Sequence, residues 1–300
     1  MSPALSMSAA GLALLVIGLW AARNDIAHAR GIGKIAALAH LCVALPLAVF
    51  GAEHLSNANS MLALVPSYMP LRMFWVYFVG LALIAAALSI ALKILVRWSG
   101  LLVGIMMFLF VAMLHLPGAL AAGTRIVWTI VFRELSFGGG AWVLAGVAMR
   151  RDGDPRSPYL ITVGRVLIAI TTLLFGVQHF LHPLALPGVP LQKEMPAWVP
   201  ARPVIDYATG AFLIAAGLSF LLARKTGLAA EYLGAWIVLL VLVIYGPVLI
   251  GALQSPNAGV QIEGLNYFAD TLLFGGVILS LAHTKAGYSP QTGPIQSSRN

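Results

Sequence analysis

Two segments of the chain place a histidine three residues after a glycine near the end of an apolar run. The first reads Phe50-Gly51-Ala52-Glu53-His54, and the second reads Phe175-Gly176-Val177-Gln178-His179, at an offset of 125. Residues three apart share one face of a helix, so each glycine permits a close helix contact beside its imidazole. The imidazole then either hydrogen-bonds a neighbouring helix or loop, or contributes to a ligand site.

The residue before each histidine differs between the two segments. Glu53 occupies the position that Gln178 occupies in the second segment. A carboxyl group can transfer a proton at this place and an amide cannot, so we expect proton transfer only at the first segment. The candidate ligand-binding residues are His54, His179, Glu53 and Gln178, with Arg72 and Arg202 as further polar contacts.

Charged residues also lie deep within apolar runs. Glu134 and Asp270 match at an offset of 136, and each lies roughly 12 Å along its predicted helix at about 1.5 Å per residue. A carboxyl group at this depth is costly unless it is paired, protonated or facing water. Arg133 adjoins Glu134, but helical neighbours point about 100° apart, so we expect its partner on another helix. Asp206 is expected to pair with Arg202, four positions earlier. These groups form either ion pairs between helices or a pathway for protons or a ligand.

Other reactive groups give little indication of a metal or thiol centre. Cys42 is the single cysteine, which excludes an intramolecular disulfide and a Cys-x-x-Cys relay. His179 and His182 have the spacing of two metal ligands, and His54 with His179 could ligate haem from facing helices. Pro183 ends this helix and no third ligand is evident, so we predict no metal site and do not expect haem.

Elements long enough to cross a membrane must position these residues. The chain is 60% apolar and 9% charged, with a mean hydropathy of +0.92, far more apolar than a soluble core requires. A hydrocarbon core of about 30 Å needs roughly 20 apolar residues per helix. The sequence predicts an all-α, polytopic membrane protein with nine helices near 4–22, 33–55, 71–96, 100–121, 126–149, 159–182, 203–223, 228–253 and 262–283. The first is predicted to be a membrane anchor, because no basic residue precedes it and Arg23 follows it.

The distribution of Lys and Arg predicts the orientation, because basic loops stay on the cytoplasmic side. Most basic residues fall on that side if the N-terminus lies outside and the C-terminus lies in the cytoplasm. We therefore expect a multi-pass protein of a bacterial inner membrane, in contact with the lipid bilayer. The basic residues are spread over the loops, so we expect no nucleic-acid partner.

The similarity between the two segments continues downstream, which indicates a duplicated unit. Residues from Pro66 to Leu92 recur between Pro196 and Leu222 at an offset of 130. This predicts an N-terminal helix and turn over 1–32, four-helix repeats over 33–149 and 159–284 in the same orientation, a cytoplasmic linker over 150–158, and a disordered tail over 285–300. Pro117 and Pro247 recur in the third helix of each repeat, where each removes a hydrogen bond and predicts a bend.

The repeats also carry matched loop and helix motifs. The second contains Met195-Pro196-Ala197-Trp198-Val199-Pro200 and Tyr207-Ala208-Thr209-Gly210, and the first contains Val65-Pro66-Ser67-Tyr68-Met69-Pro70 and Tyr77-Phe78-Val79-Gly80. With the Phe-Gly-x-x-His segments, these residues resemble the DoxX-like integral membrane proteins over most of 33–283. The resemblance implies a four-helix membrane unit, in a family that includes subunits of thiosulfate:quinone oxidoreductase. Usual members have one unit, so the tandem form is a departure, and the resemblance assigns no catalytic residue.

Three functions are compatible with these features. The first is a membrane subunit that binds a quinone or similar lipophilic molecule and serves an oxidoreductase partner, which rests on the resemblance and on the polar residues near the histidines. The second is a small-solute or proton-coupled transporter, because duplicated bundles with broken helices and intramembrane acids are typical of transporters. The third is a structural or assembly role without a ligand. Whether the protein is itself an enzyme stays open at this point.

Overall fold

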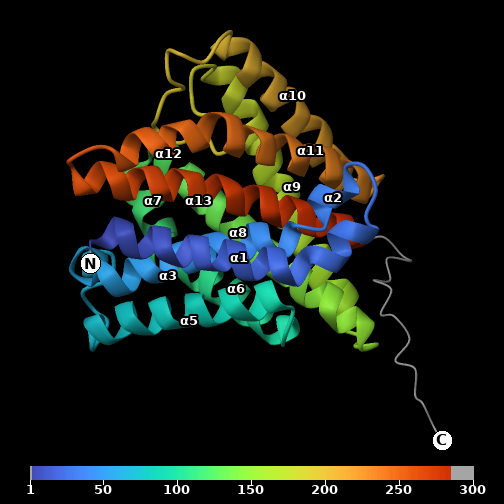
Figure 1. Ribbon diagram of the computed structural model, residues 1–300, viewed down its shortest axis with the longest axis horizontal. Helices are drawn as coiled ribbons and strands as arrows, with labels where there is room; N and C mark the ends of the chain where they lie inside the picture. The colour runs from blue at the N-terminus through green and yellow to red at the C-terminus, as the bar shows by residue number, and fades with distance from the viewer. Residues whose placement is uncertain (1, 285–300) are drawn as a thin grey trace, which may run out of the picture.

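The computed structural model describes residues 2–284, and the tail predicted over 285–300 lies outside the described residues. Within residues 2–284, nine helices are long and apolar enough to cross a membrane, the number that the sequence predicts. The chain is an all-α, multi-pass membrane protein with two parallel four-helix repeats and an additional N-terminal helix (Figure 1). In Figure 1 the labelled N-terminus lies at one end of the molecule and the red end of the described chain, after α13, lies at the other, as an odd number of spans requires.

The helices follow the predicted order. The N-terminal span is α1 (Pro3–His28), followed by the short α2 (Gly33–Ala36). The first repeat contains α3 (Ala39–Ser56), the short α4 (Ala58–Leu62), α5 (Arg72–Leu92), a span made of α6 (Val96–Phe110), η1 (Val111–His115) and α7 (Leu116–Ala122), and α8 (Arg125–Arg151). The second contains α9 (Ser157–Leu181), α10 (Arg202–Leu221), a span made of α11 (Thr226–Leu240), η2 (Val241–Tyr245) and α12 (Gly246–Leu253), and α13 (Ala258–Ser280) with η3 (Leu281–Thr284).

The spans of the two repeats close into a ring. Each packs on the next in chain order, from α3, α5, α6 and α8 to α9, α10, α11 and α13, and α13 returns to α3. The first helix of each repeat therefore packs against the last helix of the other repeat. Helices α8 and α13 also contact each other across the ring, and 89% of the apolar stretch of α13 is buried. Side chains of the two repeats thus meet along α8 and α13.

The two repeats share backbone irregularities at the offset of 130. Leu71 and Ala201, with φ of 51° and 49°, have left-handed conformations at the starts of α5 and α10. Leu95 and Lys225, with φ of 55° and 51°, do the same before α6 and α11. Non-glycine residues rarely adopt this conformation. Its recurrence at matched positions therefore shows that the two repeats have the same backbone conformation at these turns.

The third span of each repeat contains a π-helical turn where the sequence predicts a bend. Pro117 and Pro247 lack the N–H that an α-helix would donate to the carbonyl four residues earlier. Directly before them, the N–H of Leu116 donates to the carbonyl of Val111, five residues earlier, and η2 repeats this pattern. Each helix therefore accommodates its proline by forming one wider, π-helical turn.

The second predicted helix, 33–55, differs from the structure. The chain forms α2, leaves helical geometry near Leu38, and starts α3 only at Ala39. The carbonyl of Ala36 accepts a hydrogen bond from His283 Nε2 at 3.1 Å. His283 lies 247 residues further along the chain. A tertiary contact therefore favours the break between α2 and α3 within an otherwise apolar run.

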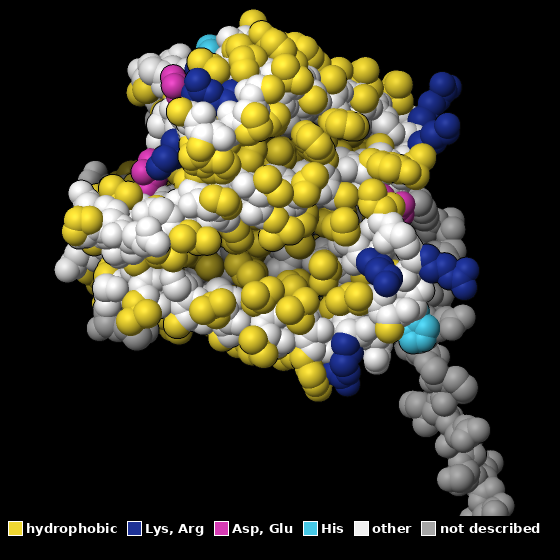
Figure 2. All heavy atoms as spheres, turned by 45° about the horizontal axis from the view of Figure 1, so that its top comes forward, with side chains coloured by type: hydrophobic (Ala, Val, Ile, Leu, Met, Phe, Trp, Pro, Cys, Tyr) yellow, Lys and Arg dark blue, Asp and Glu magenta, His cyan; other side chains and the backbone are white. Residues whose placement is uncertain are grey.

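The outer surface of the molecule has the polarity that a membrane requires. Figure 2 shows a broad apolar flank, with many of the visible Lys and Arg side chains gathered at the right-hand end of the view. The surface includes large apolar side chains that are more than half exposed, such as Leu12, Leu102 and Leu242. Exposed apolar area of this extent is stable in lipid and unstable in water.

Close helix contacts in the centre depend on glycine. A Cβ atom at Gly164 of α9 would lie 2.2 Å from the carbonyl oxygen of Gly139 in α8. We expect Gly164→Val to lower thermal stability strongly, because backbone on both sides prevents relaxation. Gly118→Ala is the control, since nothing lies within 4 Å of a Cβ there, and its melting temperature in detergent should stay equal or rise. Equal melting temperatures for the two variants would contradict the close packing of α8 and α9.

Candidate functional site

A cavity of about 1110 Å³ lies between α3, α5, the span that contains η1, α8 and α13. Most of its wall is apolar, with side chains such as Phe50, Phe78, Val79, Met106 and Phe110. Its polar lining residues are Glu53, His54, His115, Arg133, Glu134, Gln192, Glu263, Asn266, Tyr267 and Asp270. Because α13 belongs to the second repeat, the cavity lies at the junction of the two repeats.

A three-membered charge cluster forms one wall of this cavity. The Nη1 atom of Arg133 donates to Asp270 Oδ2 at 2.6 Å, so the expected partner on another helix is Asp270. The Nη2 atom also donates to Glu134 Oε1 at 2.8 Å, although we expected neighbouring residues to point apart. The long guanidinium side chain bends back far enough to reach its neighbour. One cation thus joins the matched acids of both repeats.

His54 and Glu53 line the cavity from α3. The carbonyl of Phe50 accepts a hydrogen bond from His54 Nδ1 at 2.8 Å. A carbonyl only accepts, so Nδ1 carries a proton and Nε2 is the acceptor of the neutral ring. Glu53 Oε1 accepts a bond from Asn266 Nδ2 of α13 at 3.3 Å. The first segment therefore places a carboxyl group and an imidazole at the same cavity.

His179 is enclosed by protein instead of lining this cavity. Its Nδ1 lies 3.0 Å from Asp206 Oδ1, and both side chains are fully buried. The backbone N–H of Gly188 donates to His179 Nε2 at 3.1 Å, which leaves the ring proton on Nδ1, facing the carboxylate. The predicted pair of Asp206 with Arg202 is therefore wrong, because Asp206 turns inward to the histidine of the neighbouring helix.

Gln178 does not line the cavity either, and its side chain joins α9 to α8. Its Oε1 accepts hydrogen bonds from Arg125 at 3.1 Å and from Thr129 at 3.0 Å, both on α8. Arg125 further donates to the carbonyls of Pro190 and Leu191 at 2.6 and 3.2 Å. These bonds tie α8, α9 and the following loop together at the junction of the repeats.

The two matched arginines hold the outer loops. Arg72 donates to the carbonyls of Leu62 and Val65, with Nη2 at 2.7 Å from each oxygen. Arg202 donates to the carbonyl of Met195, the position that matches Val65, at 3.1 Å. The structure therefore places both arginines against loop backbone, and neither lines the cavity.

The loop of the second repeat fills the place that the cavity occupies in the first. The segment from His179 to Pro196 is five residues longer than that from His54 to Pro66. Its residues Leu186 and Val189 are buried, and the carbonyl of Pro187 accepts a bond from the Tyr245 hydroxyl at 3.0 Å. Tyr245 matches His115 at the offset of 130. We call the cavity of the first repeat the first half-site and the matching place in the second repeat the second half-site. The longer loop thus fills the second half-site, while the shorter loop leaves the first half-site open.

Sequence reasoning missed several polar residues of the cavity. His115 lies in η1 just before Pro117, and Asn266 and Tyr267 lie on α13. His115 carried a usable signal, because an ionisable residue within an apolar span is a candidate functional group. Asn266 and Tyr267 carried none, since only the contact between α13 and α3 brings them to the first repeat.

The remaining ligand predictions concern metal and haem. Within residues 2–284, no group of three or more His, Cys, Asp or Glu side chains is placed to hold a metal ion. The two histidines are not brought together at the cavity, because only His54 lines it while His179 contacts Gly188 and Asp206. The arrangement does not provide paired histidine ligands for a haem at this place.

The fold and the cavity define a multi-pass helical membrane protein with a large, mainly apolar cavity that is closed on one side by charged groups. Such a cavity suits a lipophilic molecule with a polar head. Comparisons of the chain with protein-family models, with curated proteins and with solved structures give no match.

Proposed function

We propose that this protein is a DoxX-like membrane protein that binds a quinone or a similar lipophilic molecule in the cavity of its first repeat. The observation that carries the proposal is the two-part lining of the cavity. Phe50, Phe78 and Phe110 supply apolar and aromatic surface, whereas Arg133 and His54 supply polar groups. A quinone has the matching parts, a hydrocarbon tail and a ring with two carbonyl acceptors.

The polar groups also fit the chemistry of a quinone. Reduction to the quinol takes two electrons and two protons, and Glu53 and Glu134 are acids at the cavity wall. The electrons would come from an oxidoreductase partner, for which this protein would be the membrane subunit. In the proposed bacterial inner-membrane orientation, with the N-terminus outside, the cavity lies in the outer half of the bilayer.

Retention of a lipophilic molecule tests this proposal. We expect mass spectrometry of protein purified in mild detergent to detect a bound quinone, and His54→Ala to reduce its amount at least about tenfold through loss of a polar contact. The matched control is His182→Ala, because His182 is exposed and does not line the cavity. Absence of quinone from the unaltered protein, or equal retention in both variants, would reject the proposal.

A proton-coupled transporter is the second candidate, and one observation favours it. Arg133 bridges Glu134 of the first repeat and Asp270 of the second at a membrane cavity. A charge cluster shared by two repeats can couple protonation to their relative movement. Uptake into liposomes driven by a pH gradient, and its loss in a folded Glu134→Gln variant, would favour this function over the first.

A further inference from the structure

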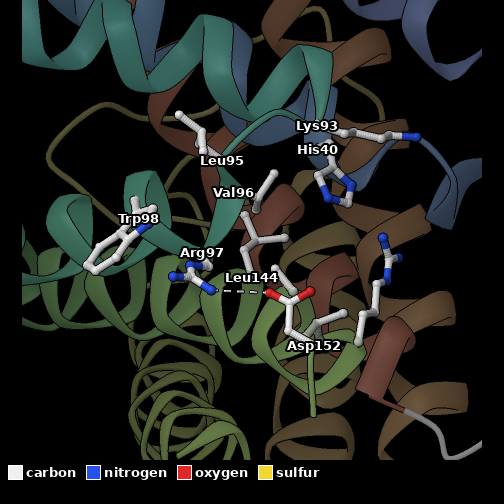
Figure 3. A pocket seen from close by; sticks show the side chains of 11 residues that line it. His40, Lys93, Leu95, Val96, Arg97, Trp98, Leu144 and Asp152 are labelled. Atoms are coloured by element: carbon white, nitrogen blue, oxygen red, sulfur yellow. Dashed lines mark hydrogen bonds and ion pairs between the residues drawn. The ribbon is translucent and has the colours of Figure 1, made fainter. Parts of the chain in front are cut away.

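A second cavity, of about 420 Å³, lies at the end of the molecule where the basic residues gather. It is enclosed by the start of α3, the turn between α5 and α6, and the end of α8, and it shares no lining residue with the first cavity. Figure 3 shows Arg97 joined to Asp152, with His40 and Lys93 on another side of the space. Its volume is within the range of about 300–1,000 Å³ that small-molecule sites have.

The charged lining of this second cavity is mainly positive. Three cations, Lys93, Arg97 and Arg151, face one acid, Asp152. Lys93 pairs with Asp25, which does not line the cavity, and Arg97 Nη1 lies 3.4 Å from Asp152 Oδ2, near the limit for an ion pair. Arg151 makes no ion pair with any residue among 2–284. The site therefore keeps positive charge that an anion can neutralise.

The surroundings of this cavity have the character of a membrane boundary. Trp98 is 48% exposed, and the guanidinium carbon of Arg97 lies 5.0 Å from its ring centroid. Leu95, beside them in the lining, is 68% exposed. Tryptophan and arginine at helix ends sit at the level of lipid headgroups, and exposed leucine next to them meets acyl chains. A soluble anion would gain nothing from this apolar flank.

We propose that this second cavity binds the phosphate headgroup of an anionic phospholipid from the leaflet at the basic end. Arg97 and Arg151 hold the phosphate oxygens by charge-assisted hydrogen bonds. Lys93 adds positive charge at the rim, and the start of α6 in the wall favours an anion through its helix dipole. The acyl chains lie along the exposed surface beside Leu95 and Trp98.

Native mass spectrometry of the full chain, titrated with phosphatidylglycerol or phosphatidylcholine, tests this site. The variant is Arg97→Gln with Arg151→Gln, and the control is Arg224→Gln with Lys225→Gln. The control removes the same charge from the turn between α10 and α11, which matches the turn between α5 and α6 and does not line the cavity. We expect the variant to weaken phosphatidylglycerol binding about 25-fold, which is about fivefold for each of the two removed charges.

Three results distinguish the possible explanations. A selective loss of phosphatidylglycerol in the cavity variant, with less than about threefold change in the control, supports the site. Equal weakening in both variants would mean that general surface charge attracts the lipid, and it overturns the proposal. Displacement of the lipid by glycerol 3-phosphate at a similar concentration would mean that the site takes a soluble phosphate, and it also overturns it. Arg151→Gln alone is the second variant if the double variant does not fold, because Arg151 has no ion pair to lose within 2–284.

Discussion

Arg133→Met is expected to destabilise the protein by about 3–5 kcal/mol, since it removes the cation from a largely buried cluster and leaves two carboxyl groups facing each other. The side chains of Arg133, Glu134 and Asp270 are only 10–14% exposed. Neither acid has another cation at ion-pair distance within residues 2–284. Thermal unfolding in mild detergent, followed by tryptophan fluorescence, measures the loss.

A triple variant provides the control for this first experiment. Arg133→Met combined with Glu134→Gln and Asp270→Asn removes all three charges and keeps the side-chain volumes similar. We expect it to recover most of the lost stability, because neutral amides avoid the cost of an unpaired buried charge. If Arg133→Met alone unfolds within about 1 kcal/mol of the unaltered protein, the acids are already neutral or hydrated by the cavity. The cluster would then contribute little to joining α8 and α13.

His179→Ala and His54→Ala should differ sharply although the two positions are matched in sequence. His179→Ala leaves the buried carboxylate of Asp206 and the N–H of Gly188 without their partner. We expect it to destabilise the protein by about 3–5 kcal/mol and to loosen the loop that follows α9. His54 is only partly buried and bonds a carbonyl of its own helix, Phe50. Its removal should change stability by less than about 1 kcal/mol.

Two measurements separate these histidines. Thermal unfolding reports global stability, and limited trypsin digestion after Lys193 reports opening of the loop, which is held by the bond from the N–H of Leu186 to the carbonyl of Lys193 at 2.9 Å. Faster cleavage in His179→Ala than in His54→Ala is the expected result. Similar cleavage and melting in the two variants would mean that the loop does not depend on His179, and that the half-sites differ for another reason.

The matched places in the two repeats differ in what fills them. In the second repeat, the place that matches the cavity is occupied by the protein itself through Pro187 and Gly188. The open half-site keeps the acid Glu53, while the filled one has the amide Gln178, which binds α8. The second repeat also contributes Asp270 to the cavity of the first.

The sequence by itself determined the all-α class and the number of membrane spans. Hydropathy over roughly 20 residues decides whether a helix crosses a membrane, so the nine predicted spans match the nine found within residues 2–284. The positions of Pro117 and Pro247 predicted a bend in each third span, because proline acts on its own helix; the structure has a π-helical turn directly before the segment that contains each proline. These properties depend on neighbouring residues in the chain.

Only the tertiary structure decided which residues meet. The bond from Arg133 to Asp270 joins residues 137 apart in the chain, and the bond from Asn266 to Glu53 joins residues 213 apart. The inward turn of Asp206 and the entry of the longer loop into the second half-site depend on how α9, α10 and η2 pack together. Apolar helices in a membrane are distinguished by packing and a few polar contacts rather than by hydropathy. The pattern that identifies each span therefore does not identify its partner.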